Sequence, residues 1–320
     1  MLPKISVITP FLDAESFLQD AITSVQTQSF SEWELLLVDD GSTDTSPSIA
    51  SLAAATDDRI KVLQRPRELA GGAAAARNVA LRAAAGEFVA FLDADDVYEG
   101  RMLEVYFDAL MARPEVAMVY GPTRWWDQDN PDDDWIQSMN HQAGRTHEPP
   151  RLLAWVIVLQ MGEVPCTCGT LIRRSAIEAV GGFEEHFQLY EDQSLWAKLL
   201  LRFPTHVLSY CGARYRQHPG STSVRATMEG TYDRLSPHSA RANFLEWLQE
   251  YVMKSGVRSW TLNGAIYLAR APYAGGSGIR SYLNRAAWQG FLLMTKLEGR
   301  LKHKFEVAVR YLRPRRRARS

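Results

Sequence analysis

Residues 84–96 read AAGEFVAFLDADD, and this stretch indicates the fold class. A turn of small residues leads into an uninterrupted apolar run, Phe88–Leu92, which ends in three carboxylates within four positions. A short run that is apolar at every position is typical of a strand buried in a parallel sheet. Ligands bind outside the carboxyl ends of the strands in such sheets. The stretch therefore predicts a buried strand that ends at a binding site.

Further short apolar runs alternate with helical patterns around this strand. The predicted strands are Ile5–Thr9, Glu34–Val38, Ile60–Gln64, Phe88–Leu92 and Val116–Tyr120. Helices are predicted for Ala14–Gln28, where apolar residues recur at helical spacing, and for the alanine-rich run Gly72–Ala85. This alternation predicts an α/β fold with a mostly parallel sheet flanked by helices.

The second half of the chain has three further parts. Residues 122–165, rich in Trp, Asp, Gly and Pro, predict an irregular excursion or lid whose tryptophans either pack the sheet edge or stack on sugars. Strands and helices then return, and after residue 230 the pattern is wholly helical. The predicted elements are Thr167–Arg173, Thr205–Tyr210 and Ala213–Arg216 as strands, and Ser175–Val180, Asp192–Arg202, Ala240–Met253, Trp260–Ala271 and Ile279–Leu297 as helices.

Charge is unevenly distributed along the 320 residues. Residues 300–320 contain nine of the 36 Lys and Arg but one of the 37 Asp and Glu, so this tail carries +8 and the remainder −9. A basic tail predicts contact with an anionic partner, and a merely solubilising end is the alternative. The acidic body argues against a nucleic-acid enzyme.

The three cysteines, Cys166, Cys168 and Cys211, are too few for a disulfide framework. We find no signal-peptide pattern, and no apolar run reaches the roughly 18 residues that a membrane span needs. The expected location is therefore the cytoplasm.

Acidic residues cluster at predicted strand ends and at a helix start. Asp39 and Asp40 follow the second strand and suit a base or ribose, although Asp-Gly-Ser is also ordinary turn chemistry. Asp93, Asp95 and Asp96 follow the fourth strand, and oxygen ligands at such spacing suit Mg²⁺ or Mn²⁺.

Two further motifs are less specific on their own. Asp192 begins a helix, where an acidic residue is also a normal cap. Arg216 and His218 share a loop and suit a diphosphate or a metal ion.

In combination, these motifs resemble the inverting nucleotide-sugar glycosyltransferases of family 2, which have the GT-A fold. The resemblance covers residues 4 to about 223. It rests on the order and spacing of Ser6–Pro10, Ser24-Val25 with Gln28, Glu34–Asp44, Ala75–Asn78, Ala84–Asp96, Gly181–Phe183, Glu191-Asp192 and Arg216–Ser221. It implies a GT-A domain at residues 1–230, with the lid at 122–165, followed by a helical extension at 231–299 and the basic tail at 300–320.

The resemblance also implies roles for single residues. The base pocket would consist of Pro10, Asp40 and Arg77, with Asp39 close by, and Asp93 would contact the ribose. Asp95 would bind the metal ion on the donor diphosphate, with Arg216 and His218 stabilising the leaving group or completing the metal site. Asp192 would be the general base for attack by an acceptor hydroxyl, with inversion of configuration. UDP is the first expectation for the nucleotide, with dTDP or GDP as alternatives, because Pro10-Phe11-Leu12-Asp13 departs from the family's Pro-x-Tyr-Asn.

Two other functions are weighed against this one. A nucleotidyltransferase that makes nucleotide-sugars would need a glycine-rich loop after the first strand, and Thr9–Asp13 contains no glycine. A non-catalytic nucleotide-sugar or glycan binding protein is the other alternative, although Asp95 and Asp192 are both present. The acceptor is a glycan, a lipid-linked or a protein-linked molecule. The C-terminal helices are an acceptor platform or a homodimer interface, and the tail suggests peripheral attachment to an anionic inner membrane face.

Overall fold

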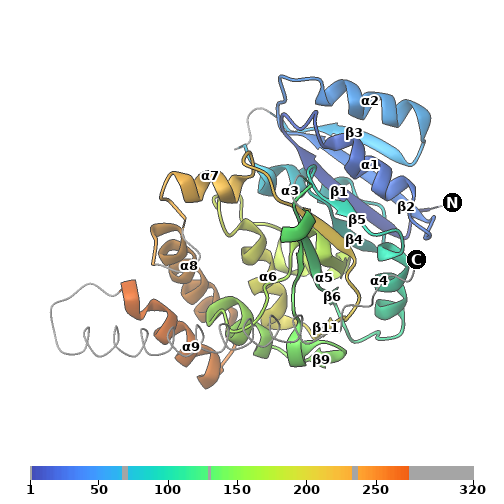
Figure 1. Ribbon diagram of the computed structural model, residues 1–320. Helices are drawn as coiled ribbons and strands as arrows, with labels where there is room; N and C mark the ends of the chain where they lie inside the picture. Colours follow the sequence, from blue (N-terminus) through green and yellow to red (C-terminus); the bar gives the residue numbers. More distant parts are fainter. Residues whose placement is uncertain (1, 67–70, 129–130, 233–236, 274–320) are drawn as a thin grey trace, which may run out of the picture.

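The structure is a computed structural model that describes residues 2–66, 71–128, 131–232 and 237–273. Its centre is an eight-stranded sheet in the order β3-β2-β1-β4-β10-β6-β11-β9 (Figure 1). The strands are β1 (Ile5–Phe11), β2 (Trp33–Asp39), β3 (Ile60–Gln64), β4 (Phe88–Phe91), β6 (Met118–Tyr120), β9 (Arg145–His147), β10 (Thr170–Arg173) and β11 (Thr205–Val207). The predicted α/β class is confirmed.

The direction of the strands places several motifs at one edge of this sheet. β1 pairs in parallel with β2 and with β4, and β2 pairs in parallel with β3. β10 enters antiparallel between β4 and β6, so the sheet as a whole is mixed. Because parallel strands end on the same side, the residues that follow β1, β2 and β4 meet at one edge.

Helices cover both faces of the sheet because its strands are apolar on both sides. In β2, Leu35 and Leu37 face one core, whereas Leu36 and Val38 face the other. The first core is covered by α1 (Leu18–Gln26), α2 (Ser46–Thr56) and α4 (Met102–Met111). The second is covered by α3 (Ala73–Ala83), α5 (Arg174–Val180) and α6 (Glu191–Arg202).

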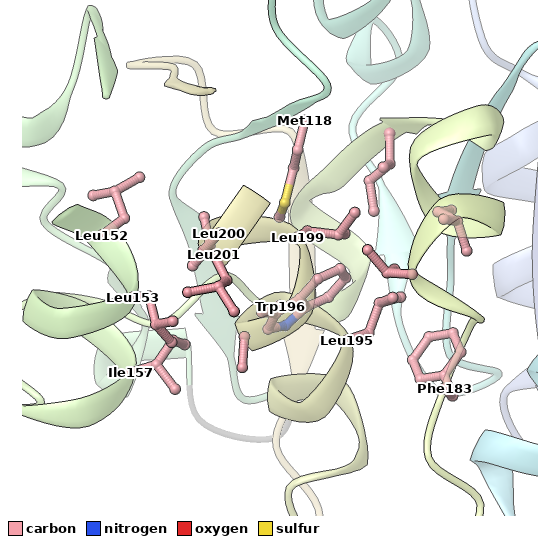
Figure 2. Packing of buried hydrophobic residues seen from close by; sticks show 14 of the residues in the cluster. Met118, Leu152, Leu153, Ile157, Phe183, Leu195, Trp196, Leu199, Leu200 and Leu201 are labelled. Atoms are coloured by element: carbon pink, nitrogen blue, oxygen red, sulfur yellow. The ribbon is translucent and has the colours of Figure 1, made fainter. Parts of the chain in front are cut away.

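Helix α6 is buried at the centre of the second core. Figure 2 shows Trp196 of α6 among Leu195, Leu199 and, from neighbouring elements, Met118 and Ile157. Ile157 belongs to a π-helix, η3 (Leu153–Val158), that packs against α6. Full burial of each such side chain contributes roughly 1.5–3 kcal/mol. The packing fixes the position of α6 and therefore of the acidic residues at its start.

A second sheet lies beside the main one, in the order β5-β12-β7-β8. Its strands are β5 (Val97–Tyr98), β7 (Thr123–Trp126), β8 (Trp135–Ile136) and β12 (Ala213–Arg216). Residues 122–165 thus supply β7, β8 and β9, where the sequence predicted irregular structure. β7 and β9 pair with strands far along the chain, β12 and β11, whereas β8 pairs with β7 within the segment.

Other boundaries differ from the predicted ones for local reasons. The first helix begins at Leu18 and not at Ala14, because Asp13 has φ 48° and the Ala14 N–H donates to Ser46 Oγ (2.8 Å). Short helical turns occupy Pro131–Asp133, Asn140–Gln142, Thr167–Gly169 and Ala271–Tyr273. The turn at Thr167–Gly169 displaces the start of the predicted strand to Thr170. The sequence did not predict α2 or α4.

The C-terminal part of the described chain is helical. It contains α7 (Thr222–Met228), α8 (Ser239–Ser255) and α9 (Trp260–Arg270), and α8 packs against α6 (Figure 1). None of the helices in the described ranges combines the length and apolar character needed to cross a bilayer. The predicted helix Ile279–Leu297 and the basic tail at 300–320 lie outside the described residues.

Candidate active site

The turn after β2 contains the first predicted carboxylate. Asp39 is buried, and its Oδ1 accepts hydrogen bonds from the N–H groups of Gly41 (3.1 Å) and Ser42 (2.8 Å). Gly41 has φ 105°, a conformation that side-chain-bearing residues rarely adopt. Pro10 lies in the neighbouring strand, opposite Val38. Asp39 therefore shapes the turn, and Pro10 lies beside it.

Asp40 links the ends of two other elements. One of its carboxylate oxygens is paired with the guanidinium of Arg65, which follows β3. The other accepts a hydrogen bond from the Gly72 N–H (2.8 Å), directly before α3. Asp40 thus fixes the wall of the predicted base pocket.

A buried arginine joins two carboxylates from different elements. Arg77 of α3 is 2% exposed, and its Nη2 lies 2.5 Å from Asp93 Oδ1, after β4. Its Nη1 lies 3.4 Å from Glu191 Oε1, at the start of α6. Burial alone would lower the pKa of Arg77, but the carboxylates of Asp93 and Glu191 raise it above its ordinary value. The arginine stays charged and holds the end of β4 next to the start of α6.

Asp192 follows in the first turn of α6. Burial, and then the neighbouring Glu191, raise its pKa to about 7, although the Gln193 N–H donates to its Oδ1 (2.6 Å) and Arg77 is near. The pKa of Glu191 is also raised, first by burial, with Arg77 opposing. A carboxylate whose pKa lies near neutrality suits a general base.

Asp95 and His218 form the second centre of the site. Asp95 Oδ2 lies 3.0 Å from His218 Nε2, and the two side chains are 31% and 18% exposed. The imidazole also packs on Phe17, with 4.6 Å between ring centroids. The structure therefore brings together the two residues predicted to bind a metal ion, which are far apart in the sequence.

Arg216 contacts the backbone of Asp95 and has several other partners. It is 2% exposed, its Nε donates to the Asp95 carbonyl (2.8 Å), and its Nη2 lies 2.9 Å from Asp20 Oδ2. Its Nη1 donates to Gln128 Oε1, and its guanidinium lies 4.3 Å from the ring centroid of Trp126. All three guanidinium nitrogens have protein partners, so in this arrangement Arg216 fixes the loop that carries Asp95.

Asp96 completes the acidic cluster from within the protein. It is 1% exposed, and its Oδ1 accepts a hydrogen bond from the Arg216 N–H (2.9 Å). Among the residues that the structure describes, its Oδ2 has no hydrogen-bond partner. Burial, and then the charge of Asp95, raise its pKa well above its ordinary value. From the sequence, Asp96 could either share the metal ion or cap the following helix. It is not the cap, because β5 separates it from α4.

The residues present suit a divalent cation that also has ligands from a substrate. Asp95 supplies a carboxylate and His218 an imidazole, donors that Mn²⁺ accepts and that leave most coordination positions open. Within the described residues, no group of three or more His, Cys, Asp or Glu side chains is arranged to hold a metal ion. An ion held by these two residues would take its remaining ligands from water or from a bound molecule.

Several residues of the site were not predicted from the sequence. Arg65 and Asp20 have no distinguishing local pattern, since their partners Asp40 and Arg216 are distant in the sequence. Glu191 could have been found from the sequence, because it directly precedes the predicted base. Two adjacent acidic residues at a helix start indicate a cationic side chain nearby.

Residues 6–181 match the sequence pattern described as Glycosyl transferase family 2. The chain belongs to this family. The predicted family and the predicted enzyme class, a glycosyltransferase, are confirmed.

One relative matches over most of its length. TuaG of Bacillus subtilis, a glycosyltransferase assigned to teichuronic acid biosynthesis, is 31% identical over 216 residues, which are 67% of this chain and 79% of TuaG. In seven other curated relatives, the stretch that matches this chain makes up 14% to 53% of the relative's own length.

Two solved structures share the fold. TarS of S. aureus, in complex with UDP-GlcNAc, has a TM-score of 0.56 and 20% identity over 93% of this chain and 92% of that one. The mannosyltransferase PcManGT of Pyrobaculum calidifontis, in complex with GDP-Man and Mn²⁺, has a TM-score of 0.53 and 18% identity over 93% of this chain and 87% of that one. At this identity the likeness concerns the fold, and it confirms the predicted GT-A architecture.

Proposed function

We propose that this protein transfers a sugar from a nucleotide diphosphate sugar to an acceptor hydroxyl, with inversion at the anomeric carbon. The observation that carries the proposal is the buried network in which Arg77 joins Asp93, at the end of β4, to Glu191, directly before Asp192. It unites a predicted donor-binding carboxylate and a predicted base across two elements.

Asp192 is the general base in this proposal. Its pKa of about 7 leaves it substantially ionised at neutral pH, yet basic enough to take a proton from a hydroxyl as that oxygen attacks the sugar. The attack comes from the face opposite the leaving diphosphate, so no covalent intermediate is needed. Glu191 remains paired with Arg77 and keeps negative charge near the base.

The donor nucleotide lies at the carboxyl ends of β1, β2 and β4. Pro10, Asp40 and Arg77 line the base pocket, with Asp39 close by, and Asp93 contacts the ribose. A UDP-sugar is the first candidate, supported by the UDP-GlcNAc complex of TarS, whereas the GDP-Man complex of PcManGT keeps GDP as an alternative.

Asp95 and His218 hold a divalent cation, Mn²⁺ or Mg²⁺, in this proposal. When bound, such an ion stabilises the negative charge that develops on the leaving diphosphate. The Mn²⁺ in the PcManGT structure supports a divalent metal. Arg216 keeps the Asp95 backbone in place through its bond to the carbonyl oxygen.

The acceptor is a glycan, a lipid-linked or a protein-linked molecule that contacts residues 122–165 and the helical extension at 231–299. The basic tail at 300–320 attaches the protein to the anionic inner face of a membrane, where each Lys or Arg contributes about 1 kcal/mol. Co-sedimentation with vesicles containing phosphatidylserine tests this, and a tail deletion that leaves co-sedimentation unchanged excludes the attachment. Light scattering tests the alternative role of the helices as a homodimer interface.

The donor site is tested by calorimetric titration of UDP, dTDP, GDP and ADP, with and without Mn²⁺. We expect Mn²⁺-dependent binding of one nucleotide, lost in Asp95→Ala and weakened in His218→Ala. Asp192→Asn should bind the same nucleotide normally and lose turnover. Binding without turnover in the wild type, over a broad acceptor screen, would favour the non-catalytic alternative, and no binding at all would contradict the proposal.

A further inference from the structure

Tyr190, directly before Glu191 and Asp192, has an unusual backbone conformation. Its φ and ψ are 70° and 14°, in the left-handed region that L-residues with side chains avoid. The left-handed residues that end α5 and α8, Gly181 and Gly256, are glycines, whereas Tyr190 is the one aromatic residue among the side-chain-bearing residues with positive φ in the described chain. A bulky aromatic residue in this conformation persists only where its surroundings hold it.

Helix α8 of the helical extension supplies those surroundings. The Tyr190 ring is stacked on Phe244, with 5.1 Å between centroids and 20° between planes. Its hydroxyl lies 3.2 Å from His238 Nε2, and the guanidinium of Arg241 lies 5.6 Å from its ring centroid. Tyr190 is only 6% exposed.

Helix α8 is itself fixed to the core of the catalytic domain. Arg241 is 5% exposed, and its Nη2 donates to the carbonyls of Ile157 (2.8 Å) and Val158 (2.9 Å), at the end of the π-helix η3. The π-helix packs against α6. The helical extension, the π-helix and α6 therefore pack against one another around Tyr190, and these three elements are called the frame below.

This frame acts on the first turn of α6. The Tyr190 carbonyl accepts a hydrogen bond from the Ser194 N–H (2.9 Å), and Ser194 Oγ donates to the Glu191 carbonyl (2.6 Å). A change of φ at Tyr190 would rotate the peptide that leads into Glu191 and displace the carboxylate of Asp192.

We propose that α8 positions Asp192 through Tyr190, with Phe244, His238 and Arg241 as positioning residues. The inference rests on the proposed role of Asp192 as the base. It gives the helical extension a part in catalysis that does not require contact with the donor.

A matched pair of variants on α8 tests it. Phe244→Ala removes the stacking partner of Tyr190, and Leu248→Ala removes another fully buried side chain of the same helix that lies outside the Tyr190 stack. Nucleoside diphosphate release is measured with whichever of UDP-glucose, UDP-GlcNAc and GDP-mannose the wild type hydrolyses in the presence of Mn²⁺. We expect Phe244→Ala to lower kcat at least tenfold with KM within threefold, and Leu248→Ala to keep both within threefold. Equal kcat in the two variants, or a loss confined to KM, overturns the inference.

Two further measurements keep the test decisive if Phe244→Ala does not fold. Glycine accepts the left-handed conformation and alanine does not. The kcat of Tyr190→Gly should therefore be at least threefold higher than that of Tyr190→Ala, and equal kcat values overturn the inference. Amide hydrogen exchange over 190–196 needs no substrate and should be faster in Phe244→Leu than in Leu248→Val; equal exchange overturns it.

The variant Asp192→Asn separates the two levels of the argument. Full turnover in Asp192→Asn removes the proposed base and with it this inference. Loss of turnover there, together with equal kcat for Phe244→Ala and Leu248→Ala, leaves the base in place and removes only the positioning by α8.

Discussion

The raised pKa of Asp192 makes a quantitative prediction about stability. In the folded protein this pKa is about 7, against 3.8 for an ordinary aspartate. At pH values between these two, the unfolded chain has released the proton that the folded protein still holds. Stability therefore falls as pH rises from about 4 to 7 and stays at the lower level above 7. The charged carboxylate of Asp192 destabilises the fold at neutral and alkaline pH.

The variant Asp192→Asn removes this penalty and keeps the oxygen that accepts from the Gln193 N–H. Each pKa unit corresponds to about 1.4 kcal/mol, so the two units between pH 5 and 7 correspond to roughly 3 kcal/mol. Partial exposure and coupling to Glu191 reduce this, and we expect about 2 kcal/mol. The free energy of unfolding of Asp192→Asn minus that of wild type should therefore be about 2 kcal/mol larger at pH 8 than at pH 5.

Urea unfolding at the two pH values measures this difference for both proteins. The groups around Asp192 that also titrate or carry charge are Glu191, Arg77 and Asp93, and all three are kept in the variant. Glu191→Gln is a suitable control for the neighbouring carboxyl. A stability difference between Asp192→Asn and wild type that does not change between pH 5 and 8 would refute the reasoning.

Three other predictions follow from the same network and its surroundings. Because a base must be ionised, kcat/KM should rise with pH through about 7 and level off above it, and a profile from pH 5.5 to 9 that shows no such limb contradicts the role of Asp192. Arg77→Met leaves two partly exposed carboxylates without their buried cation and should lower the free energy of unfolding by about 2–3 kcal/mol, less than for a fully buried pair, measured in urea at pH 7. Gly182→Ala places a Cβ 2.7 Å from Asn78 Oδ1 at a residue with φ 70°, and should destabilise by about 1–3 kcal/mol, whereas Gly100→Ala, with open space around its Cβ, should not.

The fold class and most of the candidate site follow from local patterns in the sequence. Strands such as Phe88–Phe91 are apolar at every position, so local pattern alone shows that they are buried on both faces. Their parallel direction then places Asp39, Asp40 and Asp93 at one edge, and the order of these motifs identified the family. Each of these motifs is a run of residues that are neighbours in the sequence.

Which of these groups are in contact depends on the tertiary structure. Arg77 meets both Asp93 and Glu191, and Arg216 meets Asp20, because the sheet brings together elements distant in the chain. Within 122–165, β7 and β9 likewise pair with β12 and β11, which lie far along the chain.

Tyr190 shows the same limit most clearly. Nothing local favours a left-handed tyrosine before the base, and its conformation depends on contacts with α8, whose first residue lies 49 positions later. Hydrophobic periodicity reports which face of an element is buried, but not which partner buries it. That choice depends on the packing of the whole chain.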